Sequence, residues 1–135
     1  MLKFILYMIS LLKDPKTYKW AGVGLLALAG DYGLYNYLLG IIGMDLAKLC
    51  ATFVGVNISF NLNRIWTFKS NGTFFEDLKR YMALYLVAII VNVSVNNLAF
   101  RILEDIDLAY IAALFVSVTI GYFGQRLWVF KNRTN

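Results

Sequence analysis

The sequence carries the pattern Arg-x-Trp-x-Phe-Lys twice, beginning at Arg64 and at Arg126. A guanidinium group forms paired hydrogen bonds with phosphate oxygens, so each arginine is a candidate ligand for a phosphate group. Each pattern closes a long apolar segment, which places the arginine near the end of a membrane span, where a lipid phosphate lies. The alternative interpretation is that both side chains only extend towards the headgroups and fix the topology.

Asp31 is a carboxylate inside an apolar segment that is otherwise free of charge. An ionised aspartate at the centre of a membrane helix costs about 2.5–3.5 kcal/mol on insertion scales, so we expect it to face the interior of a helix bundle or water. One interpretation is a functional polar site in which Asp31 exchanges a proton. The other is a hydrogen bond between a protonated Asp31 and an asparagine of a neighbouring helix.

Asparagines add to this polar group. Asn57 and Asn61 precede Arg64 by seven and three residues, so the three side chains fall on one face of a helix. Asn92 and Asn96 are one helical turn apart, and we expect them to line the same cavity as the carboxylate.

These side chains require helices that cross a membrane to position them. Of the 135 residues 60% are apolar and 16% are charged, against about 45–50% and about 25% in soluble domains. A helix that crosses the membrane must also have an apolar stretch long enough for a hydrocarbon core of about 30 Å, which takes about 20 residues. We predict an all-α integral membrane protein of one domain (residues 1–135) with four spans, at residues 20–42, 46–66, 81–100 and 108–128.

The basic residues orient these spans. Eleven of the thirteen lysines and arginines lie before the first span, in the second loop or after the fourth span, whereas Lys48 and Arg101 lie on the opposite side. Because short cytoplasmic loops are rich in lysine and arginine, we predict a multi-pass protein of the bacterial cytoplasmic membrane with both termini in the cytoplasm. The basic residues that give the net charge of +5 lie at the ends of the apolar segments, as this topology requires, so the charge gives no reason to expect nucleic acid as a partner.

Two local signals concern segments outside the spans. The first twelve residues are apolar but too short to cross, and we expect a short interfacial helix on the cytoplasmic leaflet. Asp14-Pro15 should end that helix, because proline disfavours the helical conformation of the residue before it. Thr73 and Glu76 form a capping-box pattern that should begin the third helix before it enters the membrane.

An internal repeat connects the second and fourth spans. Residues 45–69 and 107–131 are identical at twelve of twenty-five positions when aligned at an offset of 62 residues. The first and third spans match more weakly at an offset of 61, in the pairs Lys19/Arg80, Trp20/Tyr81, Asp31/Asn92 and Asn36/Asn97. We interpret this pattern as the duplication of a two-helix hairpin, whose two copies have the same orientation in the membrane.

Small residues recur at every fourth position of the second and fourth spans. They are Ala47, Ala51, Gly55 and Ser59 in the one, and Ala109, Ala113, Ser117 and Gly121 in the other. Such stripes let helix backbones approach closely, so we expect the second and fourth spans to cross along them.

The aromatic residues and lysines of the repeated pattern are expected to be interface anchors, like the aromatic belts and extended lysines of other membrane proteins. This set consists of Trp66, Phe68, Lys69, Trp128, Phe130 and Lys131. Anchors of this kind hold a helix end at the level of the headgroups and take no part in chemistry.

The residue types that catalysis needs are scarce. The sequence has no histidine, one cysteine (Cys50) and no nucleotide-binding loop. We therefore expect no enzymatic activity, no metal and no cofactor.

The sequence resembles the GtrA-like family of small four-span bacterial membrane proteins. The resemblance rests on Lys-Trp-x-Gly-Val-Gly (residues 19–24) and on Asn-x-x-Arg-x-Trp-x-Phe-Lys (residues 61–69), and it covers nearly the whole chain from about residue 16. It implies a role in cell-surface polysaccharide glycosylation, in which members are proposed to flip a polyprenyl-phosphate sugar or to assist a glycosyltransferase. The second copy of the pattern departs from the first, because Phe123 stands where the first copy has its asparagine.

We therefore expect the chain to bind and translocate a polyprenyl-phosphate-linked monosaccharide, with Asp31 and the asparagines at the sugar hydroxyls and Arg64 and Arg126 at the phosphate. Homo-oligomerisation is expected, because four short helices enclose only a small cavity for such a substrate. One alternative is an adaptor for a membrane glycosyltransferase, which predicts dispensable intramembrane polar residues and an important loop at residues 69–79. Another is efflux of cationic amphiphiles, which predicts a role for Asp31 and none for the arginines.

Overall fold

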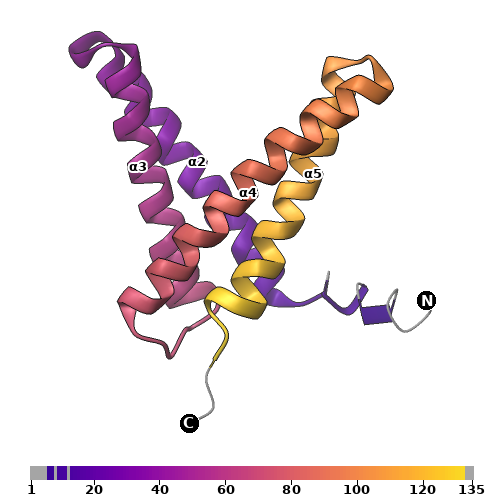
Figure 1. Cartoon of the computed structure of the whole chain (residues 1–135). Coiled ribbons are helices and arrows are strands. Elements are labelled where there is room, and N and C mark those ends of the chain that lie inside the picture. The colour runs from indigo at the N-terminus through magenta and orange to yellow at the C-terminus, as the bar shows by residue number, and fades with distance from the viewer. Residues whose placement is uncertain (1–5, 8, 12, 133–135) are drawn as a thin grey trace. The chain divides into compact units, whose positions relative to one another are not determined.

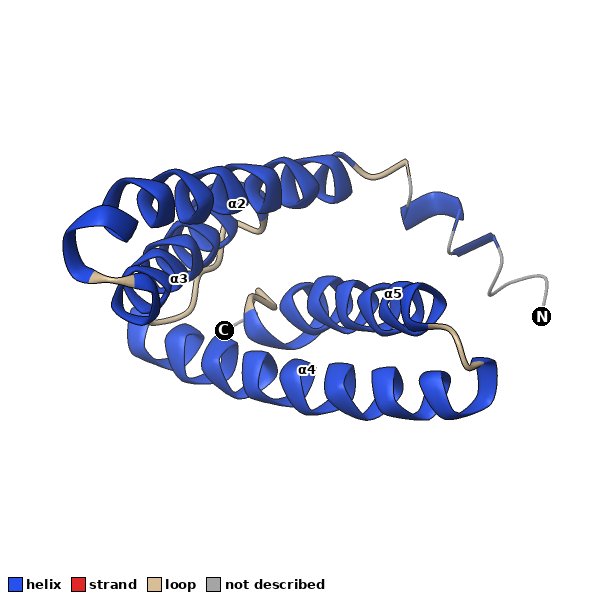
Figure 2. Ribbon diagram, turned by 90° about the horizontal axis from the view of Figure 1, so that it is seen from above, coloured by secondary structure: helices blue, strands red, loops and turns tan. Residues whose placement is uncertain are grey.

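The computed structural model describes residues 6–7, 9–11 and 13–132, which are helical apart from short turns. The elements are α2 (Pro15–Ile42), α3 (Met44–Leu62), η1 (Asn63–Thr67), α4 (Phe74–Leu103), α5 (Ile106–Gly124) and η2 (Gln125–Val129), where η1 and η2 are π-helical turns (Figure 1). Within the described residues there are helices and loops and no strand (Figure 2). The all-α class predicted from the sequence is confirmed.

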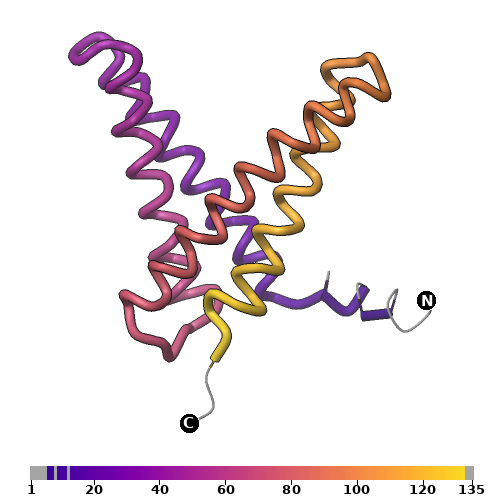
Figure 3. Tube along the Cα trace, viewed as in Figure 1, coloured from indigo at the N-terminus to yellow at the C-terminus, as the bar shows by residue number. Residues whose placement is uncertain are grey.

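The chain divides into two compact units, Met1–Lys69 and Ser70–Asn135. In the first unit α3 runs back along α2, and in the second α5 runs back along α4 (Figures 2 and 3). The single residue Gly43 joins α2 to α3, and its φ of 84° with ψ of 166° lies in a region that glycine adopts far more readily than other residues. Each unit is a closely turned antiparallel hairpin.

Three helices are long and apolar enough to cross a membrane: Pro15–Ile42, Phe74–Leu103 and Ile106–Val129. The predicted span at residues 46–66 coincides with α3 and η1 but does not reach the same apolarity. Its lower apolarity has a clear cause, because α3 contains Asp45, Lys48 and two asparagines. The chain is therefore a multi-pass membrane protein, in which α3 lacks the long apolar stretch that the other three long helices have.

The predicted break at Asp14-Pro15 is confirmed, because residues 9–11 are helical and residues 13 and 14 are not, and α2 begins directly after the break. Asp14 is the N-cap, its Oδ1 accepts a hydrogen bond from the Lys16 amide at 2.8 Å, and Pro15 is the first helical residue. Proline suits this position because its missing N–H has no partner there. The helix thus begins five residues before the predicted span at residue 20. Of the predicted interfacial helix in residues 1–12, residues 6–7 and 9–11 are helical, and the others lie outside the described residues.

The predicted capping signal at Thr73 is confirmed. The Thr73 Oγ1 atom accepts a hydrogen bond from the Glu76 amide at 3.4 Å and donates to Glu76 Oε2 at 3.1 Å. α4 therefore begins at Phe74, seven residues before the predicted span. At the opposite end, Asp105 caps α5 by accepting a hydrogen bond from the Leu108 amide at 2.9 Å.

In the first unit the small-residue stripe is buried inside the hairpin. Ala47 and Ala51 are fully buried in α3. A Cβ atom placed on Gly55 would lie 3.1 Å from the carbonyl oxygen of Ala27 and 3.1 Å from Cβ of Asp31, both in α2. The α3 backbone therefore approaches α2 closely at Gly55.

In the second unit the stripe faces α4 in the same way. Ala109 and Ala113 are buried, and Ser117 accepts a hydrogen bond from Asn92 of α4 at 2.8 Å. The prediction that the stripes of the second and fourth spans pack against each other is therefore wrong. Each stripe is used by its own hairpin, because the short turns bring α2 to α3 and α4 to α5 first.

We expect Gly55→Leu to destabilise the protein by about 1–3 kcal/mol, since a leucine side chain cannot fit where two helix backbones touch. Gly33→Leu is the matched control, because a Cβ atom on Gly33 of α2 meets nothing within 4 Å. The measurement is the free energy of unfolding in detergent micelles. Equal losses in the two variants would show that Gly55 is not a close-packing position.

Candidate functional site

Each hairpin ends in a π-helical turn that contains the repeated arginine. In the first unit the Phe68 amide donates to the Asn63 carbonyl at 2.9 Å, and in the second the Phe130 amide donates to the Gln125 carbonyl at 2.9 Å. Both bonds span five residues instead of four, which inserts one extra residue into the helix. Single π-turns of this kind occur often at functional sites.

A buried amide lies at the start of each π-turn. Asn63 is 1% exposed and donates to the Ser59 hydroxyl at 3.3 Å, and the Thr67 hydroxyl donates to Asn63 Oδ1 at 2.9 Å. Gln125, the counterpart of Asn63, is 7% exposed. These contacts satisfy the polar side chain of Asn63 inside the unit, so the turn that carries Arg64 is held by its own side chains.

Each unit also places a cation of its first helix against the tryptophan of the π-turn. Lys19 Nζ lies 5.3 Å from the centroid of the Trp66 ring. Arg80 donates from Nη1 to the main-chain carbonyl of Trp128 at 3.2 Å. The two contacts join corresponding residues of the repeat. With the arginine of the repeated pattern, two cations therefore lie at the open end of each hairpin, the end opposite the turn that joins its helices.

The two predicted phosphate ligands, Arg64 and Arg126, are half-buried, and each lies in the π-turn of its own unit. Arg126 donates from Nη1 to the Tyr122 hydroxyl at 2.6 Å, and its guanidinium lies 5.9 Å from the centroid of that ring. Phe60 occupies the place of Tyr122 in the first unit, so other contacts orient Arg64. A guanidinium has five N–H donors, and the Tyr122 hydroxyl takes one of those of Arg126.

The predicted asparagines of α3 form a short ladder. Asn57 donates from Nδ2 to the Phe53 carbonyl at 2.8 Å, and Asn61 donates from Nδ2 to the Asn57 carbonyl at 2.9 Å. Each bond reaches back one helical turn, which confirms that the two side chains share a face of α3. Both amides keep an oxygen acceptor and a second N–H donor for other partners.

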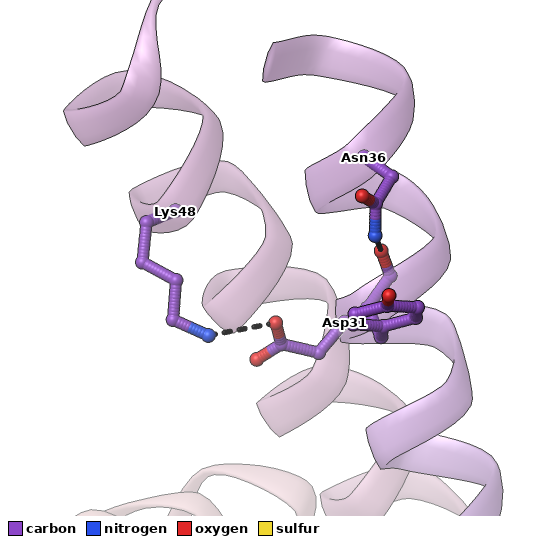
Figure 4. Close-up of polar contacts among 4 residues, drawn as sticks. Asp31, Asn36 and Lys48 are labelled. Carbon is purple, nitrogen blue, oxygen red and sulfur yellow. Dashed lines mark hydrogen bonds and ion pairs between the residues drawn. The ribbon is translucent and has the colours of Figure 1, made fainter.

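Asp31 lies in α2 and forms an ion pair with Lys48 of α3 (Figure 4). Lys48 Nζ is 2.9 Å from Asp31 Oδ1 and 5.8 Å from the centroid of the Tyr35 ring. The side chain of Asp31 is 19% exposed and that of Lys48 is 60% exposed. The alternative in which a protonated Asp31 donates to an asparagine is therefore wrong, because the partner of Asp31 is a cation.

Asn92 and Asn96 are half-buried residues of α4. Asn92 donates from Nδ2 to Ser117 Oγ and so connects α4 to α5. In the repeat Asn92 corresponds to Asp31, so the same position of the first helix carries an ion pair in one unit and an amide–hydroxyl bond in the other. A cavity lined jointly by these asparagines and Asp31 involves both units, and it stays a prediction.

The predicted interface anchors fall into two groups. Trp66 and Trp128 are 46% and 47% exposed, and Lys69 and Lys131 are exposed, as expected of anchors. The prediction is wrong for the two phenylalanines, because Phe68 is 3% and Phe130 is 2% exposed. The backbone amide of each phenylalanine donates the hydrogen bond that closes a π-turn. The ring centroids of Phe130 and of Tyr81 in α4 are 6.2 Å apart.

A small cleft lies beside η2 in the second unit. Its volume is about 40 Å³, and it is lined by Tyr81, Leu84, Tyr85, Ala88, Gly121 and Gln125. Ligand sites usually have roughly 300–1,000 Å³, so this cleft does not hold a monosaccharide. Within the part of the chain that the structure describes, no group of three or more His, Cys, Asp and Glu side chains is placed to hold a metal ion.

Three cations of the site, Lys19, Arg80 and Lys48, are absent from the residues predicted from the sequence. A signal for the first two is present, because the repeat aligns them and a hairpin brings them opposite the tryptophans. Lys48 is 17 residues from Asp31, and their pairing depends on the register between α2 and α3. No local pattern specifies that register.

A family model described as GtrA/DPMS, transmembrane domain, matches residues 19–130. The match runs from Lys19 in α2 to Phe130 after η2 and so includes both hairpins and both π-turns. A comparison with curated proteins gives no match.

We expect Asp31→Asn and Lys48→Gln to be strongly coupled in a double-mutant cycle, because each single change removes the charge partner of the other group. The expected coupling is about 0.5–3 kcal/mol in the free energy of unfolding in bicelles. A cycle of Asn92→Ala and Ser117→Ala serves as the comparison and should give about 0.6 kcal/mol, the average for hydrogen bonds between membrane helices. Additive effects of the Asp31 and Lys48 changes would contradict an ion pair in the membrane.

Proposed function

Because the chain belongs to the family of the GtrA/DPMS transmembrane domain, we propose that it translocates a polyprenyl-phosphate-linked monosaccharide across the bacterial cytoplasmic membrane. Membership indicates a role in the handling of sugars for glycosylation at the membrane. In this proposal the chain is a transporter without an enzymatic step, and the sugar is used for a polysaccharide of the cell surface.

The observation that carries the proposal is the pair of cationic hairpin ends. Each end combines two cations, an exposed tryptophan and a π-turn, at the level where an aromatic belt meets lipid headgroups. A guanidinium can bond two phosphate oxygens at once, and a lysine adds a point charge. Such an end suits a phosphate whose hydrocarbon chain stays in the bilayer.

The proposed topology has four spans with both termini in the cytoplasm. α3 packs along α2 and follows it after the single residue Gly43, so a membrane-crossing α2 carries α3 back across the membrane. The cationic ends then lie at the cytoplasmic face, where the positive-inside bias places lysine and arginine. The opposite ends carry Asp45, Glu104, Asp105 and Asp107.

The asparagine ladder supplies partners for a sugar beyond the phosphate. Asn57 and Asn61 lead along α3 from the π-turn towards Gly43, and their free acceptors suit hydroxyl donors. The cleft beside η2 is too small to enclose the sugar, so we propose a homo-oligomer whose copies together form the path.

The adaptor remains the second candidate, because hydrogen bonds connect the loop after the first unit to the start of α4. Asp77 is 1% exposed and accepts a hydrogen bond from the Ser70 hydroxyl at 2.7 Å, and Ser70 Oγ also accepts from the Gly72 amide at 3.1 Å. A loop held in this way offers a surface to a glycosyltransferase. Efflux of cationic amphiphiles is less well supported, because Lys48 already neutralises Asp31.

We expect Arg64→Lys and Arg126→Lys each to weaken binding of a polyprenyl phosphate about tenfold, which corresponds to about 1.4 kcal/mol. Lysine keeps the charge but loses the planar fork that bonds two oxygens. The measurement is titration of the purified protein in nanodiscs with the lipid. Lys131→Arg is the control and should leave the affinity unchanged, since Lys131 is an exposed anchor. Full affinity in the Arg64→Lys/Arg126→Lys double variant would exclude this phosphate site.

We expect a cysteine at Gly72 to be protected from an impermeant thiol reagent in intact cells and a cysteine at Glu104 to react. The experiment needs a Cys50→Ala background, because Cys50 is exposed. Alanine suits this position, since Ala112 is the counterpart of Cys50 in the repeat. Reaction at position 72 together with protection at position 104 would invert the proposed orientation.

A further inference from the structure

The side chain of Lys48 points away from the nearest end of its helix. A Cβ atom placed on Gly55 would lie 3.1 Å from Cβ of Asp31, so Asp31 is level with Gly55. Lys48 lies seven residues nearer to the Gly43 turn, which is about 10 Å along the helix axis. Its ammonium nevertheless reaches Asp31 Oδ1 at 2.9 Å. A lysine that only anchored the helix would extend towards the nearby headgroups, in the opposite direction.

Tyr35 completes a compact group with these two charges. It lies one turn after Asp31 on α2. The Lys48 ammonium is 2.9 Å from the Asp31 carboxylate (Figure 4) and 5.8 Å from the centroid of the Tyr35 ring. We call Asp31, Tyr35 and Lys48 the Asp31 cluster. It presents a carboxylate acceptor, ammonium donors and an aromatic face, and its net charge is zero.

The second unit has no equivalent of this cluster. The repeat places Asn92, Asn96 and Tyr110 at the positions of Asp31, Tyr35 and Lys48. Asn92 is engaged by Ser117, and the Tyr110 side chain is 64% exposed. The cationic ends are therefore common to both units, whereas the Asp31 cluster belongs to the first unit alone. A feature that both units share suits the polyprenyl phosphate, which is common to all lipid-linked sugars. A feature of one unit suits the sugar, which differs between them.

We propose that the Asp31 cluster is the subsite that recognises the sugar ring of the lipid-linked substrate, an inference that rests on the proposed function. A carboxylate and an ammonium 2.9 Å apart accept from and donate to neighbouring hydroxyls of one ring, by charge-assisted hydrogen bonds. The Tyr35 ring packs against the apolar face of the sugar. The ligand of this subsite is an uncharged polyhydroxyl ring, because a neutral ion pair has no net attraction for a second phosphate.

The test compares two lipids on the full-length protein in nanodiscs: polyprenyl phosphate and the same lipid carrying glucose, mannose or galactose. The informative variant is Asp31→Asn/Lys48→Tyr, which gives the first unit the residues that the second unit has at these positions. We expect it to bind the preferred glycosylated lipid about tenfold more weakly and the sugar-free lipid as well as the wild type does. Tyr110→Phe is the matched control in the second unit and should change neither affinity.

The possible results separate this inference from the proposed function. Binding of neither lipid by the wild type would overturn both. Binding of both lipids with an undiminished preference for the glycosylated one in the double variant would overturn the Asp31 cluster as the sugar subsite and leave the phosphate site standing. Equal loss of both lipids in a folded double variant would also overturn it, since a sugar subsite cannot affect a sugar-free lipid.

A second variant covers the case in which the double variant does not fold. Tyr35→Leu keeps the ion pair and removes only the aromatic face, and it should lower the preference for the glycosylated lipid several-fold. An unchanged preference in Tyr35→Leu would contradict the subsite. Free glucose, mannose and galactose serve as competitors, and displacement of the lipid by free sugar at equal concentration would show that the subsite takes soluble sugars instead of lipid-linked ones.

Discussion

The constraint on which the structure depends is that polar groups inside a membrane must find their partners within the protein. Asn36, Asn57, Ser94 and Thr119 meet it locally, since each donates to the carbonyl one turn earlier at 2.7–2.8 Å. Such side chains need no second helix, so their remaining acceptors are free to bind a ligand. The polar groups that do bond across a hairpin are then the exceptions that require a specific explanation, and Asp31 is the first of them.

The π-turns follow from the same constraint at the ends of the hairpins. A five-residue bond keeps the Phe68 and Phe130 amides satisfied while it adds a residue to the turn. The extra residue changes the direction of the side chains that follow, so the phenylalanines are buried while the tryptophans before them stay exposed. The cations Lys19 and Arg80 then meet the tryptophans from the first helix of each hairpin. The cationic end is thus a product of backbone geometry as much as of charge.

Features that depend on composition or on a few adjacent residues were accessible from the sequence. The helical fold follows from apolar length, and the Thr73 cap follows from a four-residue pattern. The sequence was less informative where a pattern has two structural meanings or none. A small-residue stripe specifies close packing without specifying the partner helix, and hydropathy contains no sign of a π-turn. The ion pair of Lys48 with Asp31 depends on helix register, which side-chain packing decides.

The difference between the two hairpins comes down to the residue that faces the first helix. Ser117 offers a hydroxyl to Asn92, and their bond fixes that amide between α4 and α5. Gly55, at the corresponding position, offers no side chain, so the helices touch and Asp31 has no partner at its own level. The carboxylate must then be neutralised from elsewhere, and Lys48, seven residues before Gly55 on α3, reaches towards it. Together with Asp31 in place of Asn92 and Lys48 in place of Tyr110, the missing side chain at position 55 replaces the internal clamp of the second unit by a charged, partly exposed group in the first. An exposed group of this kind contributes less to packing than a clamp does, and this is the physical reason to assign it to ligand recognition.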